Sequence, residues 1–306
     1  MQKTTQENID IYQIDSGQTG PKLMISGAVH GNEKAGPTAL NKLIELIESG
    51  EVTIDKGSLT IVPVCNPKAF EQDVRFVEYN LNRSMYPRAE NEIEYYEDRL
   101  RNVLCPLLEQ TDYLLDLHSC TAKSDAFVIL GGDYSDPVNV EFAKGIGASR
   151  IIWGWAEAVG SSDDLPDPRH GFGMTEYARE HGARAVTIEC GNHEHSRGPD
   201  IAFQAICNVL AHVGVATVPQ DLQPSDVLEG EQISIRLKEA VFKTREGDLS
   251  DNWTNMQFVS AGSQIGVFED GEAVHIPEDG YLIMPNKNAV IDAEWFYWGV
   301  SAPIEL

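Results

Sequence analysis

Long apolar runs are absent from this chain of 306 residues. No uninterrupted apolar stretch reaches the roughly 18 residues that a membrane-spanning helix needs. The N-terminal residues, MQKTTQENIDIYQID, also lack the apolar core of a signal peptide. We therefore expect neither a membrane anchor nor an export signal, and we predict a cytoplasmic protein.

Cysteine is scarce, and its five positions are scattered along the chain without a Cys-x-x-Cys pair. This distribution argues against a disulfide framework and against a cysteine-ligated zinc site. Several of the cysteines lie in apolar runs, where cysteine usually behaves as a small hydrophobic residue. A reducing compartment is the simplest setting for such a chain.

Positive charge is also in short supply, because 23 basic residues face 48 acidic residues and the net charge is −25. A surface of this kind repels nucleic acid and anionic membranes, so neither is an expected partner. An anionic small molecule would be repelled at long range as well. Binding one would require a local cluster of arginines. The sequence leaves the oligomeric state open, a homo-oligomer included.

Strand-like and helix-like segments alternate over residues 1–220. The predicted strands are Lys22–Val29, Leu59–Val64, Asp112–Leu117, Ala126–Leu130 and Ala183–Glu189, and the predicted helices are Pro37–Glu48, Glu92–Gln110, Val138–Gly145, Thr175–His181 and Ile201–Val213. The segment Ile151–Trp155 is ambiguous. Strands separated by helices predict an α/β sheet with crossover connections.

The pattern changes after Pro219, where a linker-like stretch, QPSDVLEGEQ, precedes short strand patterns and turn signals. Four segments read as strands: Ile233–Leu237, Gly266–Glu269, Tyr281–Met284 and Trp295–Trp298. The dipeptide Asp279-Gly280 is a turn signal between two of them. We predict an α/β domain over residues 1–220 and a small all-β domain over residues 221–306.

The strongest local signal for chemistry is the tetrapeptide His30-Gly-Asn-Glu33, just beyond a predicted strand and before a helix. Ligands of open α/β sheets gather at that edge. A histidine nitrogen and a carboxylate oxygen three residues apart are both good zinc ligands, but two ligands leave a site incomplete. Alone, the motif would more often be a loop histidine beside a solvated glutamate.

His118 supplies a third ligand candidate, at the end of the apolar stretch DYLLDLHSC. Two histidines and one glutamate with an open fourth position form a catalytic zinc arrangement rather than a closed structural one. The alternative is a histidine that is hydrogen-bonded in the core. Asp116 is then either an outer partner of the site or simply a buried polar residue.

Glu189 ends another apolar strand, in AVTIECGNHEH. A carboxylate there is costly unless it has a role or a partner. We interpret Glu189 as a general base that takes a proton from a metal-activated water and passes it to the leaving amine. The alternative is a salt bridge to an arginine. His193 and His195 follow closely, and we interpret them as loop residues.

The segment from Arg75 to Arg83, RFVEYNLNR, supplies hydrogen-bond donors. Arginine pairs with carboxylates through two parallel hydrogen bonds. Asn82 and Arg83 are therefore suited to bind a substrate α-carboxylate, and Arg75 could stabilise the oxyanion of a scissile carbonyl. Taken singly, each arginine would more often be a surface residue.

These residues together resemble the succinylglutamate desuccinylase/aspartoacylase family, relatives of the zinc carboxypeptidases. The matching motifs are His30-Gly-Asn-Glu33, Leu81-Asn82-Arg83, Asp116-Leu-His118-Ser and Ile188-Glu189, and the stretch AVHIPEDGYLIMP resembles the β domain of the family. The resemblance implies a zinc carboxypeptidase-like α/β fold with a mixed sheet flanked by helices. A small all-β domain that partly covers the site would follow it.

The resemblance also implies site residues and a reaction. One Zn²⁺ per chain would be held by His30, Glu33 and His118, with Glu189 as the base. Arg75 would be the carbonyl-polarising arginine, Asn82 and Arg83 the carboxylate-binding pair, and Arg179 a further substrate arginine. The expected reaction is hydrolysis of a small N-acyl amino acid, with the acyl group and the amino acid left open. The substrate tyrosine of aspartoacylases has no clear counterpart, because the residues around Tyr297, AEWFYWG, differ.

Three other functions stay open. A zinc carboxypeptidase acting on short peptides would use the same metal and base, although a covering β domain should exclude long chains. A non-catalytic metal-binding relative would lack a use for the proposed base. A biotinyl or lipoyl carrier fits poorly, because the relevant hairpin reads Met284-Pro-Asn-Lys287 rather than a lysine between small or methionine residues.

Overall fold

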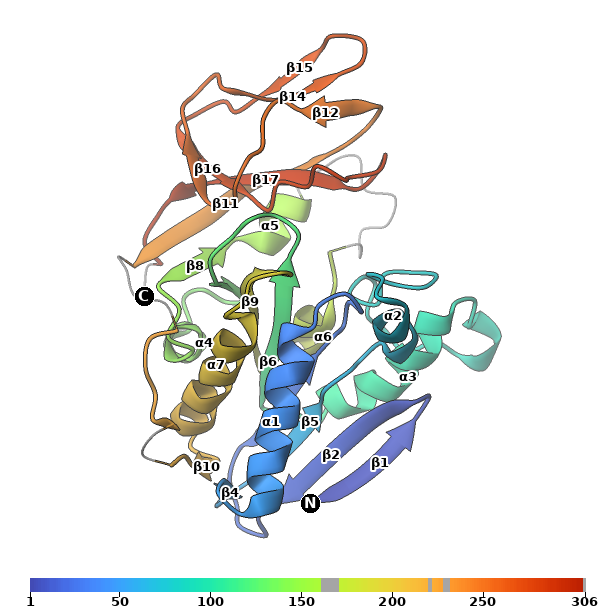
Figure 1. Ribbon diagram of the computed structural model, residues 1–306, viewed down its shortest axis with the longest axis vertical. Helices are drawn as coiled ribbons and strands as arrows, with labels where there is room; N and C mark the ends of the chain where they lie inside the picture. Colours follow the sequence, from blue (N-terminus) through green and yellow to red (C-terminus); the bar gives the residue numbers. More distant parts are fainter. Residues whose placement is uncertain (161–170, 220–221, 228–231, 305–306) are drawn as a thin grey trace.

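The computed structural model describes residues 1–160, 171–219, 222–227 and 232–304, and a large mixed sheet runs through the molecule (Figure 1). Its twelve strands are, in order across the sheet, β1 (Gln2–Gln6), β2 (Ile9–Asp15), β5 (Ser58–Val62), β3 (Lys22–Gly27), β6 (Tyr113–Cys120), β9 (Arg184–Asn192), β7 (Phe127–Leu130), β8 (Arg150–Trp153), β11 (Ile233–Phe242), β17 (Glu294–Ser301), β16 (Gly280–Ile283) and β13 (Gln257–Val259). The central strands β5, β3, β6 and β9 are parallel.

Helices cover both faces of the α/β part of this sheet. They are α1 (Ala35–Ser49), α2 (Pro67–Gln72), α3 (Tyr96–Leu108), α4 (Pro137–Gly145), α5 (Trp155–Gly160), α6 (Met174–Glu180) and α7 (Gly198–Val213), together with a 3-10 turn at Glu90–Glu92. Two short sheets complete the described structure, one of β4 (Thr53–Ile54) with β10 (Ala216–Thr217) and one of β12 (Gly247–Leu249), β14 (Gln264–Phe268) and β15 (Ala273–His275).

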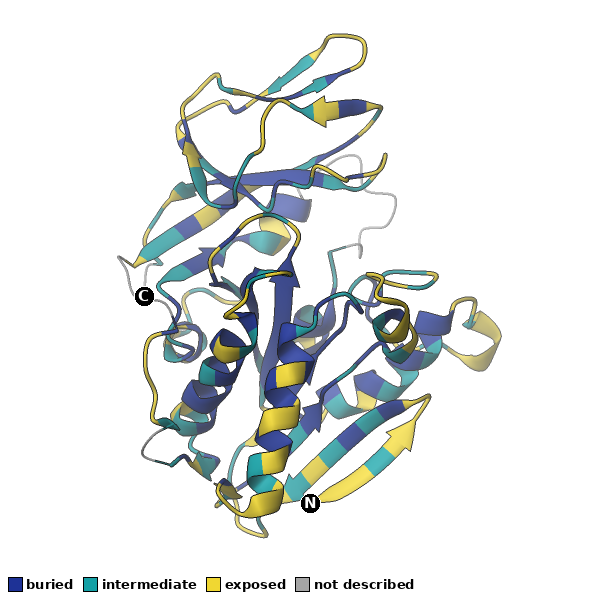
Figure 2. Ribbon diagram, in the orientation of Figure 1, coloured by how far each residue is buried: buried dark blue, intermediate teal, exposed yellow. Residues whose placement is uncertain are grey.

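Alternation along the central strands explains the two layers of helices, because successive side chains of a strand point to opposite faces. Leu115 and Leu117 of β6 pack in the core cluster that contains α1, α4 and α7. The preceding residue, Leu114, points to the opposite face and packs in the cluster that contains α3 and α6. Since both faces are covered, β6 and β9 are buried along almost their whole length, whereas α1 exposes one stripe (Figure 2).

The predicted α/β class with a following β region is confirmed, and most predicted elements lie within a few residues of the observed ones. The ambiguous segment around Ile151 divides into strand β8 and helix α5. The hairpin β1–β2 went unpredicted because its first strand, QKTTQ, is polar and largely exposed at the sheet edge. The short helix α2 also went unpredicted, although Asn66 caps its start by accepting from the Ala69 amide at 3.3 Å.

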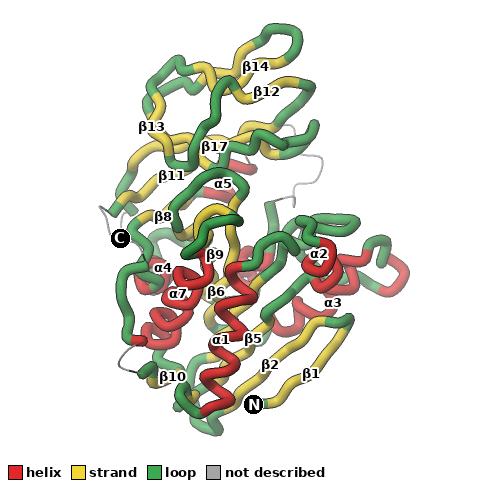
Figure 3. Tube along the Cα trace, in the orientation of Figure 1, coloured by secondary structure: helices red, strands yellow, loops and turns green. Residues whose placement is uncertain are grey.

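Residues 232–304 contain strands and loops and no helix (Figure 3). Their first strand, β11, pairs in parallel with β8, so the β region continues the same sheet that carries the α/β part. The boundary between residues 220 and 221 remains a prediction. Among the described residues, no helix is both long enough and apolar enough to cross a bilayer.

Candidate metal and substrate site

Three parallel strands bring the proposed chemical residues to one edge of the sheet. His30 lies three residues beyond the end of β3, whereas His118 lies near the end of β6. His118 and Glu189 are paired neighbours in the register of β6 and β9, so their side chains begin from adjacent positions. Because parallel strands end at the same edge, residues far apart along the chain meet here.

The turn after β3 needs a particular backbone. Ala28 has a φ of 44°, which redirects the chain as it leaves the strand. A Cβ atom on Gly31 would lie 2.0 Å from the backbone carbon of Ala69 in α2, so only glycine allows this close approach. The turn is therefore held against α2, which fixes the positions of His30 and Glu33 on either side of Gly31.

Glu33 lies between the two histidines. Its Oε1 is 2.8 Å from His30 Nδ1, and its Oε2 is 3.0 Å from His118 Nδ1. One ligand atom from each of the three residues lies within 4.8 Å of the others, and all three side chains are buried. These residues form the group among the described residues that could hold a metal ion.

Outer contacts orient the candidate ligands. Asp116 Oδ2 lies 2.8 Å from His118 Nε2, and Ser26 Oγ donates to Asp116 Oδ1 at 2.7 Å. Asn80 Oδ1 lies 3.1 Å from His30 Nε2. A carboxylate or carbonyl partner on the second ring nitrogen fixes the tautomer that leaves Nδ1 free to bind a metal. The donor set and its partners therefore fit a divalent cation.

The electrostatics of the site also favour a cation. Burial would lower the pKa of His118, but the carboxylates of Asp116 and Glu33 outweigh it and raise that pKa well above its ordinary value. Burial, with a contribution from the Arg75 charge, lowers the pKa of His30 to about 4. Burial would raise the pKa of Glu33, yet the two histidines lower it. The Asp116 and Glu33 carboxylates therefore favour a positive charge at His118. A bound metal ion can supply this charge in place of a proton.

Glu189 is buried beside these residues, at 4% exposure. Its Oε2 has no hydrogen-bond partner within the described parts of the chain. Burial first, and the Glu33 charge second, raise the pKa of Glu189 to about 8. A buried carboxylate with an unsatisfied oxygen and a pKa near neutrality has the properties of a general base. The salt bridge to an arginine that the sequence left open does not occur among the described contacts.

A cavity of about 590 Å³ opens over this edge, and its lining includes the proposed metal, base and substrate residues with one exception. Arg75 is half-exposed, and its Nη1 lies 3.4 Å from Glu33 Oε1. Asn82 and Arg83 line the same cavity. The Oδ1 of Asn82 accepts from the Met174 amide at 2.8 Å, which leaves its amide nitrogen as the donor for a ligand.

Arg179 is the exception, because it is not among the residues that line the cavity. Its Nη1 donates to the Ala185 carbonyl at 2.7 Å, and its Nη2 pairs with Glu176 on the same helix. The side chain also packs over Gly131, where a Cβ atom would lie 2.2 Å from Nη2. The structure brings Glu176, and not Arg179, to the cavity wall.

The β region contributes cavity residues to which the sequence analysis assigned no role in the site. The segment 284–294, which leads into β17, lines the cavity, and so does Tyr297 within β17. Glu294 accepts from Arg83 Nη2 at 2.6 Å across 211 residues of chain. Burial would lower the pKa of Arg83, but the Glu294 carboxylate raises it, so the guanidinium stays protonated. No local sequence signal marks Glu294, because its role depends on a distant partner.

The chain is similar to known proteins both in sequence and in fold. Residues 19–212, more than half of the chain, match the profile of the succinylglutamate desuccinylase/aspartoacylase catalytic domain. A probable aspartoacylase from Nostoc sp. is 32% identical over 118 residues, which cover 36% of this chain and 39% of that protein. The N-alpha-acetyl-L-2,4-diaminobutyric acid deacetylase of Halomonas elongata is 35% identical over 153 residues, or 47% of this chain and 43% of that protein. Both matches thus span less than half of the relative.

A solved structure extends the likeness of fold to nearly the whole chain. The crystal structure of a succinylglutamate desuccinylase/aspartoacylase from Rhodobacter sphaeroides superposes with a TM-score of 0.72 at 19% identity, covering 95% of this chain and 88% of that one. The identity is low, so this likeness concerns the fold. The family profile and the fold together show that the chain belongs to the succinylglutamate desuccinylase/aspartoacylase family, whose named members deacylate N-acyl amino acids.

Proposed function

We propose that this protein is a metal-dependent amidohydrolase that deacylates a small N-acyl amino acid. The observation that carries the proposal is the convergence of His30, Glu33 and His118 within 4.8 Å, beside the buried carboxylate of Glu189. Two imidazoles and one carboxylate favour Zn²⁺, with one ion per chain. Bound there, the ion would act as a Lewis acid on the scissile carbonyl and lower the pKa of water.

The residues around the metal position have separate tasks. Glu189 accepts the proton of the attacking water and delivers it to the nitrogen of the leaving amine, so its raised pKa suits both transfers. Arg75 donates hydrogen bonds to the oxygen that becomes negative as the amide carbonyl is attacked. Its half-exposed side chain lies next to Glu33 and so reaches the same side of the site.

The substrate α-carboxylate would bind to Asn82 and Arg83, which line the same cavity. The Asn82 amide nitrogen and the Arg83 guanidinium supply neutral and charged donors there, and Arg83 is held by Glu294. The segment 284–294 forms a wall of the cavity, which favours a small substrate over a long peptide. A carboxypeptidase that acts on short peptides is the alternative, because it would use the same metal ligands and base.

A hydrolysis screen tests the proposal. The purified protein, with Zn²⁺ added or with a chelator, would be given N-acetyl and N-succinyl amino acids alongside dipeptides that share the same C-terminal residue. We expect release of free amino acid from the N-acyl substrates, abolished by the chelator and restored by Zn²⁺. Faster cleavage of the dipeptides would identify a carboxypeptidase. Activity that survives complete metal removal would contradict the proposed metal dependence.

A further inference from the structure

The loop that carries the substrate residues has no regular secondary structure. Residues 73–89 run between α2 and the 3-10 turn without a helix or a strand, and they include Asn80, Asn82 and Arg83. Backbone N–H and C=O groups of such a loop must find partners outside a ladder or helix. Where these partners are buried and charged, they determine the position of the loop and of its side chains.

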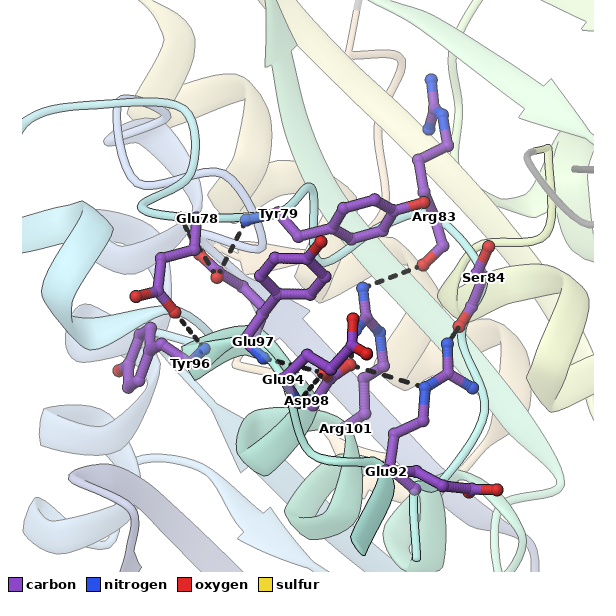
Figure 4. Close-up of polar contacts among 12 residues, drawn as sticks. Glu78, Tyr79, Arg83, Ser84, Glu92, Glu94, Tyr96, Glu97, Asp98 and Arg101 are labelled. Atoms are coloured by element: carbon purple, nitrogen blue, oxygen red, sulfur yellow. Dashed lines mark hydrogen bonds and ion pairs between the residues drawn. The ribbon is translucent and has the colours of Figure 1, made fainter. Parts of the chain in front are cut away.

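Glu97, in the first turn of α3, supplies one set of partners (Figure 4). Its Oε1 accepts from the Val77 amide at 2.8 Å, and its Oε2 accepts from the Glu78 and Tyr79 amides at 3.3 Å and 3.1 Å. The Glu97 side chain is fully buried. A buried carboxylate that meets three successive backbone amides holds this part of the loop in one conformation.

Glu78 returns the contact, because its side chain accepts from the Tyr96 amide at the start of α3. The first amides of a helix have no partner within the helix, so this bond caps α3. The helix and the loop therefore each supply a carboxylate acceptor to backbone amides of the other. A shift of either one would break these hydrogen bonds and take three backbone donors from the buried Glu97 carboxylate.

Arg101, one turn further along α3, holds the second part of the loop (Figure 4). Its Nη2 donates to the Asn80 and Arg83 carbonyls, both at 3.1 Å. Its Nη1 pairs with Asp98, and the side chain is fully buried. One guanidinium group thus fixes the backbone on both sides of Asn82.

The loop backbone held at these two points carries residues of the candidate site. Asn80 Oδ1 lies 3.1 Å from His30 Nε2 and accepts from the Asn82 backbone N–H at 3.0 Å, so the position of Asn80 orients a candidate metal ligand. Arg101 also holds the backbone of Arg83, and the guanidinium of Arg83 is the group proposed to bind the substrate carboxylate. The side chains of α3 themselves are not among the residues that line the cavity.

We propose that Glu97 and Arg101 are positioning residues, which set the placement of Asn80, Asn82 and Arg83 through the loop backbone without touching the substrate. This inference rests on the proposed function for its kinetic consequences. It concerns residues outside the cavity and assigns to a buried carboxylate and a buried guanidinium a role in substrate selection. We predict that substitution of either residue weakens recognition of the α-carboxylate, in addition to any effect on the stability of the fold.

The kinetic test uses Glu97→Gln, which keeps the size of the side chain, and Arg101→Lys, which keeps the charge. The substrate is the N-acyl amino acid that the wild-type protein hydrolyses fastest, compared with its carboxamide. We expect each variant to raise KM for the carboxylate form by roughly 10- to 100-fold, with a much smaller change for the carboxamide. Glu94→Gln and Arg99→Lys are matched controls, because both residues lie near the start of the same helix and neither is buried.

Equal losses on the carboxylate and the carboxamide, in step with a fall in melting temperature, would show a purely structural role and overturn the inference. A wild-type protein without hydrolytic activity would instead refute the proposed function. The inference then still has a direct readout, which is hydrogen exchange at the amides of residues 77–79. We expect exchange there to accelerate at least about tenfold in Glu97→Gln, measured relative to the amides of α3. Unchanged protection would overturn it without reference to activity.

Discussion

Two groups of residues line the cavity, called here the metal end and the carboxylate end, and they are built in different ways. The metal end, formed by His30, Glu33 and His118, comes from the exits of adjacent parallel strands, and its side chains contact one another directly. The carboxylate end, formed by Asn82, Arg83 and Glu294, joins an irregular loop to a strand of the β region. The metal end therefore depends on the sheet, whereas the carboxylate end depends on contacts between distant segments.

This difference indicates which properties each end controls. The exits of paired strands give the residues of the metal end one shared support, so we expect this end to preserve the reaction. A site assembled from a loop and a distant strand can change through many substitutions, so the carboxylate end should determine which substrate is accepted. Substitutions at the two ends should consequently separate into effects on kcat and effects on KM.

The largest effect should come from Glu189→Gln. The variant keeps the shape of the side chain but cannot accept the proton, so we expect kcat to fall by roughly 10²- to 10⁴-fold. Metal content, measured by atomic emission after dialysis, should stay near one ion per chain. Glu194→Gln, in the exposed turn that follows β9, is the matched control. A variant with undiminished turnover would remove Glu189 from the mechanism.

A smaller effect is expected when the orientation of a ligand is disturbed. Asp116→Asn should lower the affinity for Zn²⁺ by roughly 10- to 100-fold, because His118 loses its charged partner at Nε2. Competition with a chromophoric chelator measures this change. Ser26→Ala removes only the outer hydrogen bond to Asp116 and should have a weaker effect. If the affinity did not change in Asp116→Asn, the metal would not be held through His118.

The carboxylate end should respond in KM. Arg83→Met should raise KM for a substrate with a free α-carboxylate by about 10-fold, as expected for the loss of a charge-assisted hydrogen bond. Glu294→Gln should raise KM less, because Arg83 keeps its charge and its partner keeps an acceptor oxygen but loses the negative charge that strengthens the bond. The double variant should be no worse than Arg83→Met alone. Additive effects would show that Glu294 acts on the substrate independently of Arg83.

The smallest effect concerns stability and pH in the metal-free protein. The folded-state pKa of Glu189, about 8, lies above its ordinary value of 4.5, so its stabilising protonated form is lost as the pH rises toward and through 8. Glu189→Gln cannot ionise and should escape this loss. We expect its melting temperature to exceed that of the wild type by several degrees at pH 9, at roughly 2–4 °C per kcal/mol, and by little at pH 5. A difference that did not grow with pH would contradict the raised pKa.

The sequence predicted the metal end more completely than the carboxylate end. His30, Glu33, His118 and Glu189 each follow a recognisable apolar strand, so their position at one edge of a sheet could be inferred from local pattern. Arg179 shows the limit of this reasoning. Local sequence pattern predicts that Arg179 lies on a helix, but the direction of its side chain depends on residues from other segments. It points to the Ala185 carbonyl and to Glu176 rather than into the cavity.

By itself, the sequence determined the α/β class, the following β strands and the residues at the ends of the strands, because alternation and strand ends are local properties of the chain. Only the tertiary structure decided that Glu294 holds Arg83, that Tyr297 lines the cavity, and that Glu97 and Arg101 hold the loop. Each of these relations joins charged or polar groups from separate segments within a few ångströms. Such a pairing depends on how the segments pack, which no local pattern encodes.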